Sequence, residues 1–284
     1  MKLKRFAAGV VAAVMAFAVL GTPLGDILPF VRESVATTAG AETYGDYTYK
    51  VLDDGTVEIT EYKGTASAVN IPDTIYGRKV TSIGFYAFQA NEKVTSIFMP
   101  EGITNIEGSA FSSCTKLTEI TISKSVTCIG FYAFANCTRL QSIIIPDGVQ
   151  KIGDNTFSEC KQLTNITIPK SVTSIGDYAF CGCKKLTSIT IPESVTSIGD
   201  SAFFECISLT NMSIPHSVRC IGNYAFYKCT GLIDVTLSSG VTSIGACAFE
   251  ECKRLTSIEI PNSVVKIGFG AFSHCSKLVT IEVG

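Results

Sequence analysis

Residues 184–206 read KKLTSITIPESVTSIGDSAFFEC, and units of this pattern and length recur through most of the chain. Each unit places a Phe 23 residues after the Phe of the unit before it, with no insertion or deletion. An Ile precedes every one of these Phe by five residues, and in every unit but the first a Cys follows by three. The recurring Phe are Phe88, Phe111, Phe134, Phe157, Phe180, Phe203, Phe226, Phe249 and Phe272. Such equal spacing is typical of a tandem-repeat protein in which each unit forms one rung of a stack.

Within one rung the apolar residues predict two short strands. Segment 187–192, TSITIP, alternates polar and apolar side chains as a strand with one buried face does, and its Pro ends the strand by removing a donor. A second apolar run, VTSI at 195–198, is closed by Gly199. We expect this glycine to supply either a positive φ or a close backbone approach. Ala202 and Phe203 should then fill the interior of the rung.

No single rung can bury its apolar side chains alone, whereas stacked rungs can share one continuous core. The sequence therefore predicts a mainly β solenoid of nine 23-residue rungs over residues 80–284, with stacked parallel strands and a file of Phe rings. Parallel strands lie about 4.8 Å apart, so nine rungs should span roughly 40 Å.

The residues before the repeat divide into two segments. Basic residues at 2–5 precede the apolar run 6–20, and Ala39-Gly40-Ala41 offers small residues for cleavage, so 1–41 is expected to be a signal peptide. An uncleaved membrane anchor is the alternative, although the apolar run is short for a span. Residues 42–79 are expected to form a β-hairpin that turns at Asp53-Asp54-Gly55 and caps the first rung.

Composition and motifs argue against several functions. The net charge is -2 and the chain has no basic arm, so nothing favours nucleic acid binding. His216 and His274 are the only histidines, and they occupy different positions of the unit, so no catalytic triad is indicated. Acidic residues form no metal loop and glycines no phosphate-binding loop, so the sequence predicts a protein that is not an enzyme and has no cofactor.

The chain contains twelve Cys, and in an exported protein this number suggests disulfide bonds. Eight of them, however, stand in one column beside the buried Phe, where Cys packs as a small hydrophobe. We therefore expect a ladder of free buried thiols and keep disulfides as the alternative. Cys128 and Cys220 stand at equal positions four rungs apart, so they cannot meet. The pair Cys181 and Cys183 has poor spacing for zinc or redox chemistry.

The segments IPESVTSIGDSAFFEC and IPKSVTSIGDYAFCGC resemble the unit of the BspA-like leucine-rich repeat family. The resemblance covers residues 80–284 and extends to the preceding hairpin. It implies bacterial or protist surface or secreted proteins with a solenoid fold and a binding role, often adhesion to host, matrix or microbial partners. It implies no catalysis, and it fixes no ligand.

The outward side chains of the strands near 187–191 form the first candidate binding face. Most are Ser, Thr or Asn, which also suit any solvated strand, while the apolar Phe98 and Ile144 are either anchors for a partner or isolated exposed residues. The candidate partner-binding residues are Phe98, Glu119, Thr121, Ile144, Asn165, Asn211 and Asp234.

Two other surfaces are candidates. Aromatic residues recur at the corner after the glycine, where they either form an adhesive strip or pack against the next rung. They are Phe85, Tyr86, Phe131, Tyr132, Tyr178, Tyr224 and Phe269. Basic residues flank the strand, as an anion-binding surface or as solvated edges. They are Lys116, Arg139, Lys161, Lys184, Lys185, Lys253, Arg254 and Lys277.

These features favour a secreted or cell-surface protein that binds an extracellular protein of a host matrix or a microbial surface. A glycan-binding module is one alternative. A self-assembling structural protein is another, because the final strand, 277–283, is expected to leave an open edge for end-to-end pairing with a second copy.

Overall fold

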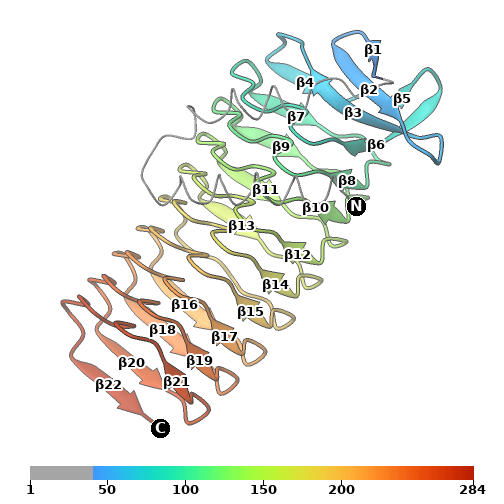
Figure 1. The fold of residues 1–284 in the computed structure, drawn as a ribbon. Helices are drawn as coiled ribbons and strands as arrows, with labels where there is room; N and C mark the ends of the chain where they lie inside the picture. Colours follow the sequence, from blue (N-terminus) through green and yellow to red (C-terminus); the bar gives the residue numbers. More distant parts are fainter. Residues whose placement is uncertain (1–40) are drawn as a thin grey trace. The chain divides into compact units, whose positions relative to one another are not determined.

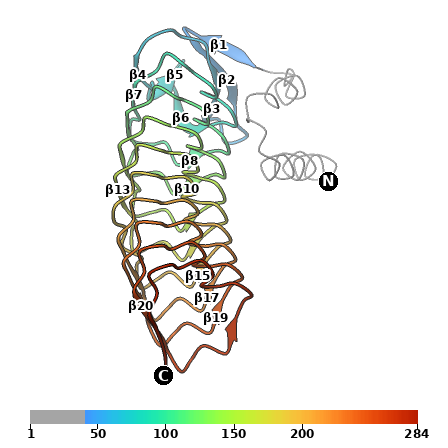
Figure 2. The same ribbon diagram turned by 90° about the vertical axis from the view of Figure 1, so that its left-hand side faces the viewer.

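The computed structural model describes residues 41–284 as one stack of similar coils, and the predicted signal peptide lies outside this range except for Ala41. Most coils have two strands joined by turns, and the chain passes once around the stack in each 23-residue rung (Figures 1 and 2). The predicted mainly β solenoid is therefore confirmed. No helix forms between residues 41 and 284, and none there could cross a membrane.

The first series of strands forms what we call the primary face. It comprises β4 (Ala68–Asn70), β7 (Ser96–Phe98), β9 (Glu119–Thr121), β11 (Ser142–Ile144), β13 (Asn165–Thr167), β16 (Asn211–Ile214), β18 (Asp234–Leu237), β20 (Ser257–Ile260) and β22 (Thr280–Val283). Pairing is parallel and advances one unit at a time, as in Ile97↔Ile120 and Met212↔Val235. In the rung of residues 187–191 no strand forms, although Ile189 and Ile191 are buried and Thr190 is exposed as the alternation predicts.

The second series forms the lateral face. It comprises β6 (Arg78–Ile83), β8 (Asn105–Ile106), β10 (Cys128–Ile129), β12 (Lys151–Ile152), β14 (Ser174–Ile175), β15 (Ser197–Ile198), β17 (Cys220–Ile221), β19 (Ser243–Ile244) and β21 (Lys266–Ile267). Neighbouring strands are parallel and in register, as in Ile175↔Ile198. The Ile of each strand from β6 to β19 is buried, so this face supplies the second wall of the core.

The third side of each rung consists of turns that are also tied to the next rung. From Phe88 to Phe249, the N–H of each ladder Phe donates to the carbonyl just before the Phe of the following rung, as in Phe180 to Ala202 at 2.8 Å; this acceptor is Ala in all cases but Thr156. Two residues per rung have a positive φ in this side, and most are not glycine. The first column contains Tyr86, Ser109, Tyr132, Asn155, Tyr178, Ser201, Tyr224, Cys247 and Gly270. The second contains Ala90, Ser113, Asn136, Glu159, Gly182, Glu205, Lys228, Glu251 and His274.

The N-terminal hairpin is continuous with the stack. Strands β1 (Glu42–Tyr44), β2 (Tyr47–Val51) and β3 (Val57–Tyr62) are antiparallel, and β3 pairs in parallel with β6, as in Ile59↔Ile83. A small second hairpin joins β5 (Thr74–Ile75) to β6. Tyr62 stacks on Phe88 at 5.0 Å between ring centroids, so it takes the place of a ladder Phe. The predicted cap thus adds one turn before the nine rungs, and the expected boundary at 79/80 falls inside β6.

The nine Phe rings form one file along the core, as predicted. Successive centroids lie 5.1–5.6 Å apart with nearly parallel planes for most pairs. All but Phe272 are almost completely buried. Offset aromatic stacking adds to the free energy gained by removing these rings from water. The ladder is therefore a source of stability that the rungs share.

The thiol ladder contains no disulfide, and all twelve Cys are free. Each ladder thiol donates to the carbonyl of the Phe in the preceding rung, as in Cys160 to Phe134 at 3.2 Å and Cys206 to Phe180 at 3.3 Å. Burial raises the pKa of Cys114 and Cys160 to about 12. These side chains therefore act as small packed groups that also satisfy backbone carbonyls.

We expect alkylation of the folded protein to separate the exposed from the buried thiols. Iodoacetamide reacts with the thiolate, and burial with a raised pKa disfavours the thiolate at buried ladder positions such as Cys114 and Cys160. Cys128 and Cys220 are exposed on the lateral face and should be modified first. Peptide mass spectrometry before and after denaturation measures this order. Modification of Cys160 at the same rate as Cys220 in the folded protein would contradict the buried ladder.

The corner glycines are needed for a close backbone approach, which is one of the two roles expected for them. A Cβ at Gly199 would lie 2.6 Å from the carbonyl carbon of Gly176, and one at Gly222 would lie 2.5 Å from that of Gly199. The positive φ falls two residues later, on Ser201 and Tyr224. Glycine is thus required because successive corners stack too closely for a side chain.

Candidate binding surface

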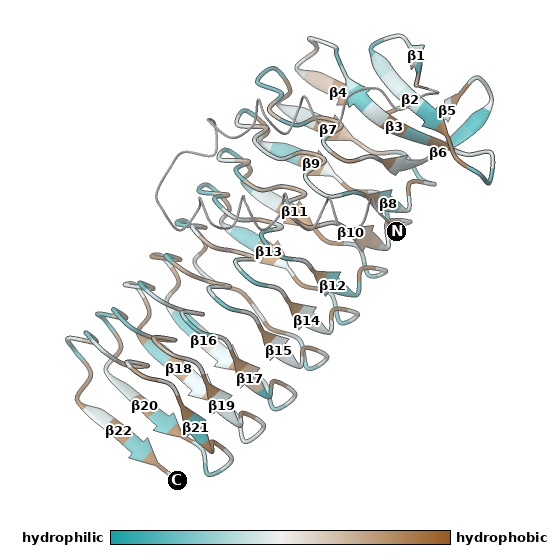
Figure 3. Ribbon diagram, viewed as in Figure 1, coloured by the Kyte–Doolittle hydropathy of each residue, from teal (hydrophilic) through white to brown (hydrophobic). Residues whose placement is uncertain are grey.

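All seven candidate partner-binding residues are exposed, and all lie on outward positions of primary-face strands. Buried Ile, Val or Met side chains alternate with them, as in β9, where Ile120 is buried between Glu119 and Thr121. Figure 3 shows hydrophilic segments on β9, β13, β20 and β22, whereas β7 and β11 run from white to brown. The period-two pattern therefore identified the outward side chains of this face.

Five of the seven residues come together on four successive strands. Phe98 pairs with Thr121 across β7 and β9, and Ile144 pairs with Thr167 across β11 and β13. Phe98 is 51% exposed and Ile144 is 77% exposed. These two apolar side chains stand two rungs apart, which is about 10 Å for parallel strands. We call the set Phe98, Glu119, Thr121, Ile144 and Asn165 the N-terminal patch.

The other two residues lie elsewhere on the face. Asn211 and Asp234 pair directly across β16 and β18, and the rung without a strand separates them from β13. Both side chains are exposed, and the nearest exposed apolar residue along the strand is Ile233, beside Asp234. The structure therefore divides the candidate residues into an amphipathic patch and a polar pair.

Many hydroxyl groups beside the patch already have backbone partners. The Oγ1 atoms of Thr118 and Thr164 donate to carbonyls of the preceding rung, Thr95 at 2.9 Å and Gln141 at 3.2 Å. The same bond recurs on the lateral face, for example from Thr196 to Thr173. These Thr columns fasten one rung to the next, which leaves Phe98 and Ile144 as the distinctive groups of the patch.

The basic residues of the rim are partly neutralised by nearby carboxylates. Lys161 pairs with Glu159 at 3.2 Å, and Lys184 pairs with Glu205 at 3.2 Å. Lys253 pairs with Glu251 at 3.1 Å. These side chains are half exposed, so each pair contributes little to stability. Their mixed charge favours the expectation of solvated edges over that of a continuous anion-binding surface.

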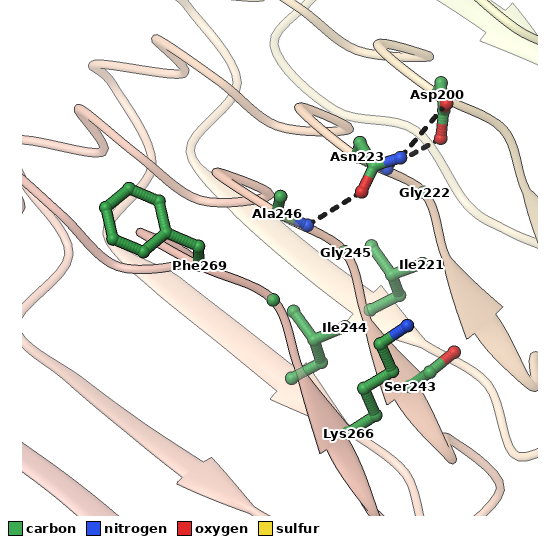
Figure 4. Close-up of a pocket in the computed structure, with 11 residues that line it drawn as sticks. Asp200, Ile221, Gly222, Asn223, Ser243, Ile244, Gly245, Ala246, Lys266 and Phe269 are labelled. Atoms are coloured by element: carbon green, nitrogen blue, oxygen red, sulfur yellow. Dashed lines mark hydrogen bonds between the residues drawn. The ribbon is translucent and has the colours of Figure 1, made fainter.

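A column of acidic residues at the corner after the glycine was not singled out in the sequence. The Oδ1 of Asp154 accepts the backbone N–H of Asp177 at 2.9 Å, and Asp177 and Asp200 accept the next N–H groups at 2.7 Å. Asn223 continues the series by accepting from Ala246 at 2.8 Å (Figure 4). We call Asp154, Asp177 and Asp200 the aspartate ladder. A shallow cavity of about 390 Å³ lies beside its C-terminal end.

We expect Asp177→Asn to stabilise the protein at neutral pH. Burial raises the pKa of the Asp177 carboxyl, the N–H of Asp200 opposes the rise, and the charges of Asp154 and Asp200 add to it. Because the folded pKa lies above the unfolded one, ionisation removes stability as the pH rises through the folded pKa. Asn keeps the acceptor oxygen and carries no charge.

The thermal unfolding midpoint of Asp177→Asn should rise by roughly a few degrees at pH 7. The gain should shrink under acidic conditions in which the Asp177 carboxyl is protonated. Asp234→Asn, at an exposed position of the primary face, is the matched control and should change the midpoint little. A lower midpoint for Asp177→Asn at neutral pH would show that the negative charge of Asp177 does not destabilise the folded protein.

The aromatic corner residues are partly exposed and partly packed against one another. Phe85 is 47% exposed and Tyr224 is 44% exposed, whereas Tyr132 and Tyr178 are half-buried. Phe85 also packs against Phe131, which lies two rungs further along the stack, with ring centroids 6.1 Å apart. The contact crosses Gly108, where a Cβ would lie 2.9 Å from both rings. Aromatic surface therefore remains accessible even where rings pack together.

Within residues 41–284 no group of three or more His, Cys, Asp or Glu side chains is placed to hold a metal ion. His216 Nδ1 lies 2.8 Å from the carboxylate of Glu193, and both side chains are largely exposed. His274 lies 3.9 Å from Glu250 in a different rung. The two histidines therefore lie in different rungs, each near one carboxylate.

The repeat pattern matches a known family. The model of the BspA type leucine rich repeat region matches residues 62–170 and 150–279, in six copies. The chain belongs to this family. The match begins at Tyr62, the residue that opens the aromatic file, so the family pattern and the stack coincide. None of the curated proteins matches the chain significantly.

Several solved structures resemble this BspA-type protein. A leucine rich cell surface protein from Faecalibacterium prausnitzii A2-165 is 27% identical, with a TM-score of 0.47, and the match covers 88% of this chain and 96% of that one. A leucine-rich repeat protein from Bacteroides ovatus is 26% identical over 84% and 88% of the two chains, with a TM-score of 0.39. The pneumococcal vaccine antigen PcpA is 17% identical over 88% and 82%, with a TM-score of 0.53, and it supports the fold alone.

Proposed function

We propose that this BspA-type protein is a non-enzymatic, secreted or cell-surface binding protein whose primary face contacts an extracellular protein. The observation that carries the proposal is the exposure of Phe98 and Ile144 on one sheet face that is otherwise polar. Family membership supports a repeat scaffold for binding or surface display, and the similar Faecalibacterium prausnitzii protein is described as a cell surface protein.

The N-terminal patch has the chemistry of a small interface core. Two apolar side chains stand about 10 Å apart. Glu119, Thr121 and Asn165 surround them with polar groups that can form hydrogen bonds. Interfaces commonly combine buried apolar anchors with such a polar rim. Strand β7 pairs with β9 and β11 pairs with β13, so each half of the patch is already organised before a partner arrives.

The test is a binding measurement with purified extracellular matrix proteins immobilised on a biosensor surface. Phe98→Ser with Ile144→Thr replaces both anchors by residue types that occupy the same column in other rungs, Ser213 and Thr167. We expect the double variant to bind at least about tenfold more weakly, because a central anchor contributes about 1–2 kcal/mol or more.

The matched control is Thr236→Ala, in the same column but on β18, far along the stack from the patch. It should bind as the native chain does, and circular dichroism should show both variants folded. Unchanged affinity in the folded double variant would refute the patch as the binding site. Absence of binding to every protein of the panel would count against the proposed partner class.

A further inference from the structure

The first positive-φ column carries a second period that is twice the length of the rung. Tyrosines at 86, 132, 178 and 224 stand on alternate rungs, and small residues stand between them. The small residues Ser109, Asn155, Ser201 and Cys247 are buried, whereas the tyrosines stay half-buried or exposed. We call Tyr86, Tyr132, Tyr178 and Tyr224 the tyrosine stripe. Its members repeat about every 9.6 Å, twice the spacing of parallel strands.

The backbone under the stripe has no free edge. The N–H of Tyr132 donates to Asp154, that of Asn155 to Asp177, and that of Tyr178 to Asp200. The N–H of Tyr224 donates likewise to Ala246 at 2.8 Å. A ligand strand therefore cannot add to this corner through backbone pairing, and recognition must use the side chains.

The interval between tyrosines matches one polypeptide conformation. A polyproline II helix has three residues per turn and rises about 3.1 Å per residue, so the same face returns about every 9.3 Å. An extended β-strand covers a similar distance in three residues, but its side chains alternate, so every third residue points to the opposite side. Aromatic grooves recognise proline-rich segments in this preformed conformation.

Negative charge beside the stripe indicates a second property of the ligand. The aspartate ladder occupies the position just before the stripe in its central rungs, so it lies beside Tyr132 and Tyr178. Within residues 41–284 none of its three carboxylates takes part in an ion pair. Lys or Arg side chains on a ligand would complement these charges.

A buried donor lies within the same stripe. The side-chain amide nitrogen of Asn155, between Tyr132 and Tyr178 in the column, has no hydrogen-bond partner in the described chain. Asn155 is only 7% exposed, and an unsatisfied buried donor is uncommon. Because this nitrogen has almost no accessible surface, a ligand carbonyl reaches it only when the side chains around it move, and polyproline II backbones leave such carbonyl groups free.

We propose that the tyrosine stripe binds a proline-rich polypeptide in the polyproline II conformation, with Lys or Arg side chains directed at the aspartate ladder. The stripe follows the lateral strands in each rung and contains no residue of the N-terminal patch. Either surface can therefore function without the other.

The experiment measures fluorescence anisotropy of a labelled peptide of about ten residues with the repeat Pro-Pro-Lys. A Gly-Ser-Lys repeat of equal length and charge tests conformation, and a Pro-Pro-Glu repeat tests charge. The native full-length chain should bind the Pro-Pro-Lys peptide about tenfold more tightly than either control. Equal binding of the two lysine peptides would overturn the proposal, whatever the variants do.

Variants then locate the site. Tyr132→Ser with Tyr178→Ser installs the residue found at the same position in the rungs of Ser109 and Ser201, and it should weaken peptide binding about tenfold. Asp177→Asn should weaken it less and reduce its salt dependence. Phe98→Ser with Ile144→Thr should leave it unchanged, which separates this proposal from the function proposed for the primary face.

Two outcomes overturn the assignment. One is unchanged peptide binding by a folded Tyr132→Ser, Tyr178→Ser variant. The other is binding of a neutral β-linked glucose oligosaccharide at these tyrosines without any preference for the Pro-Pro-Lys peptide, which would make the stripe a glycan platform.

Discussion

Replacing Phe180 by Ala is expected to lower the free energy of unfolding by about 3–5 kcal/mol. The Phe180 ring is completely buried and stacks between Phe157 and Phe203, with centroid distances of 5.5 and 5.3 Å. Hydrogen bonds between rungs on the lateral face and in the turns, such as that from the Phe180 N–H to the Ala202 carbonyl, hold the neighbours at fixed spacing, so they cannot move in to fill the cavity. Urea denaturation followed by far-ultraviolet circular dichroism measures the loss.

Phe272→Ala is the internal control for this prediction. Phe272 stacks on Phe249 at 5.5 Å but is only partly buried, so its truncation should cost less than half as much. A repeat array can lose cooperativity, so broadening of the Phe180→Ala transition should be checked with a second probe. Equal losses for the two variants would show that burial in the file does not set the cost.

Replacing Gly222 by Ala is expected to cost about 3 kcal/mol, the upper part of the range for overpacking. The new Cβ would lie 2.5 Å from the carbonyl carbon of Gly199 and 2.6 Å from the nitrogen of Asp200. Both atoms belong to backbone that is hydrogen-bonded from rung to rung, so neither can yield without separating two coils. Thermal and urea unfolding of the purified variant measure the cost.

Gly153→Ala tests the same column without the clash. There the nearest atom to a new Cβ is Thr156 Oγ1 at 3.4 Å, an ordinary contact. Alanine at a compatible site reduces the freedom of the unfolded chain, so this variant should be neutral or more stable by up to about 1 kcal/mol. If Gly153→Ala and Gly222→Ala unfold with equal free energies, the backbones of successive corners do not approach each other as closely as the structure indicates.

The fold could be predicted from the sequence because one spacing controls it. The equal interval between Phe residues allows only a stack in which every ring meets the next, and the free thiol column follows from it. The turn built on Tyr62 could not be predicted this way, because its segment departs from the unit pattern. Likewise, clean alternation at 187–191 did not produce a strand, because this segment pairs with neither β13 nor β16.

The surface was only partly predictable. Alternation identifies which strand residues point outward, as Phe98 and Ile144 do, but it gives no information on partners. The aspartate ladder depends on bonds between a side chain and the backbone of the next rung, which become apparent only in three dimensions. Gly182 and Gly270 were the one sequence sign of the two positive-φ columns, since glycine readily adopts that conformation.

The stacking of equal rungs around one core can be tested most directly by a distance measurement between Cys128 and Cys220. Both are exposed on the lateral face, at equal positions of β10 and β17, four rungs apart. Spin labels on these two thiols, in a Cys181→Ser, Cys275→Ser background, report their separation by pulsed electron resonance. Stacked rungs predict a single narrow distribution near 19 Å between the two backbones, extended only by the label arms. A broad distribution, or one centred at twice that distance, would contradict the solenoid on which both proposed surfaces depend.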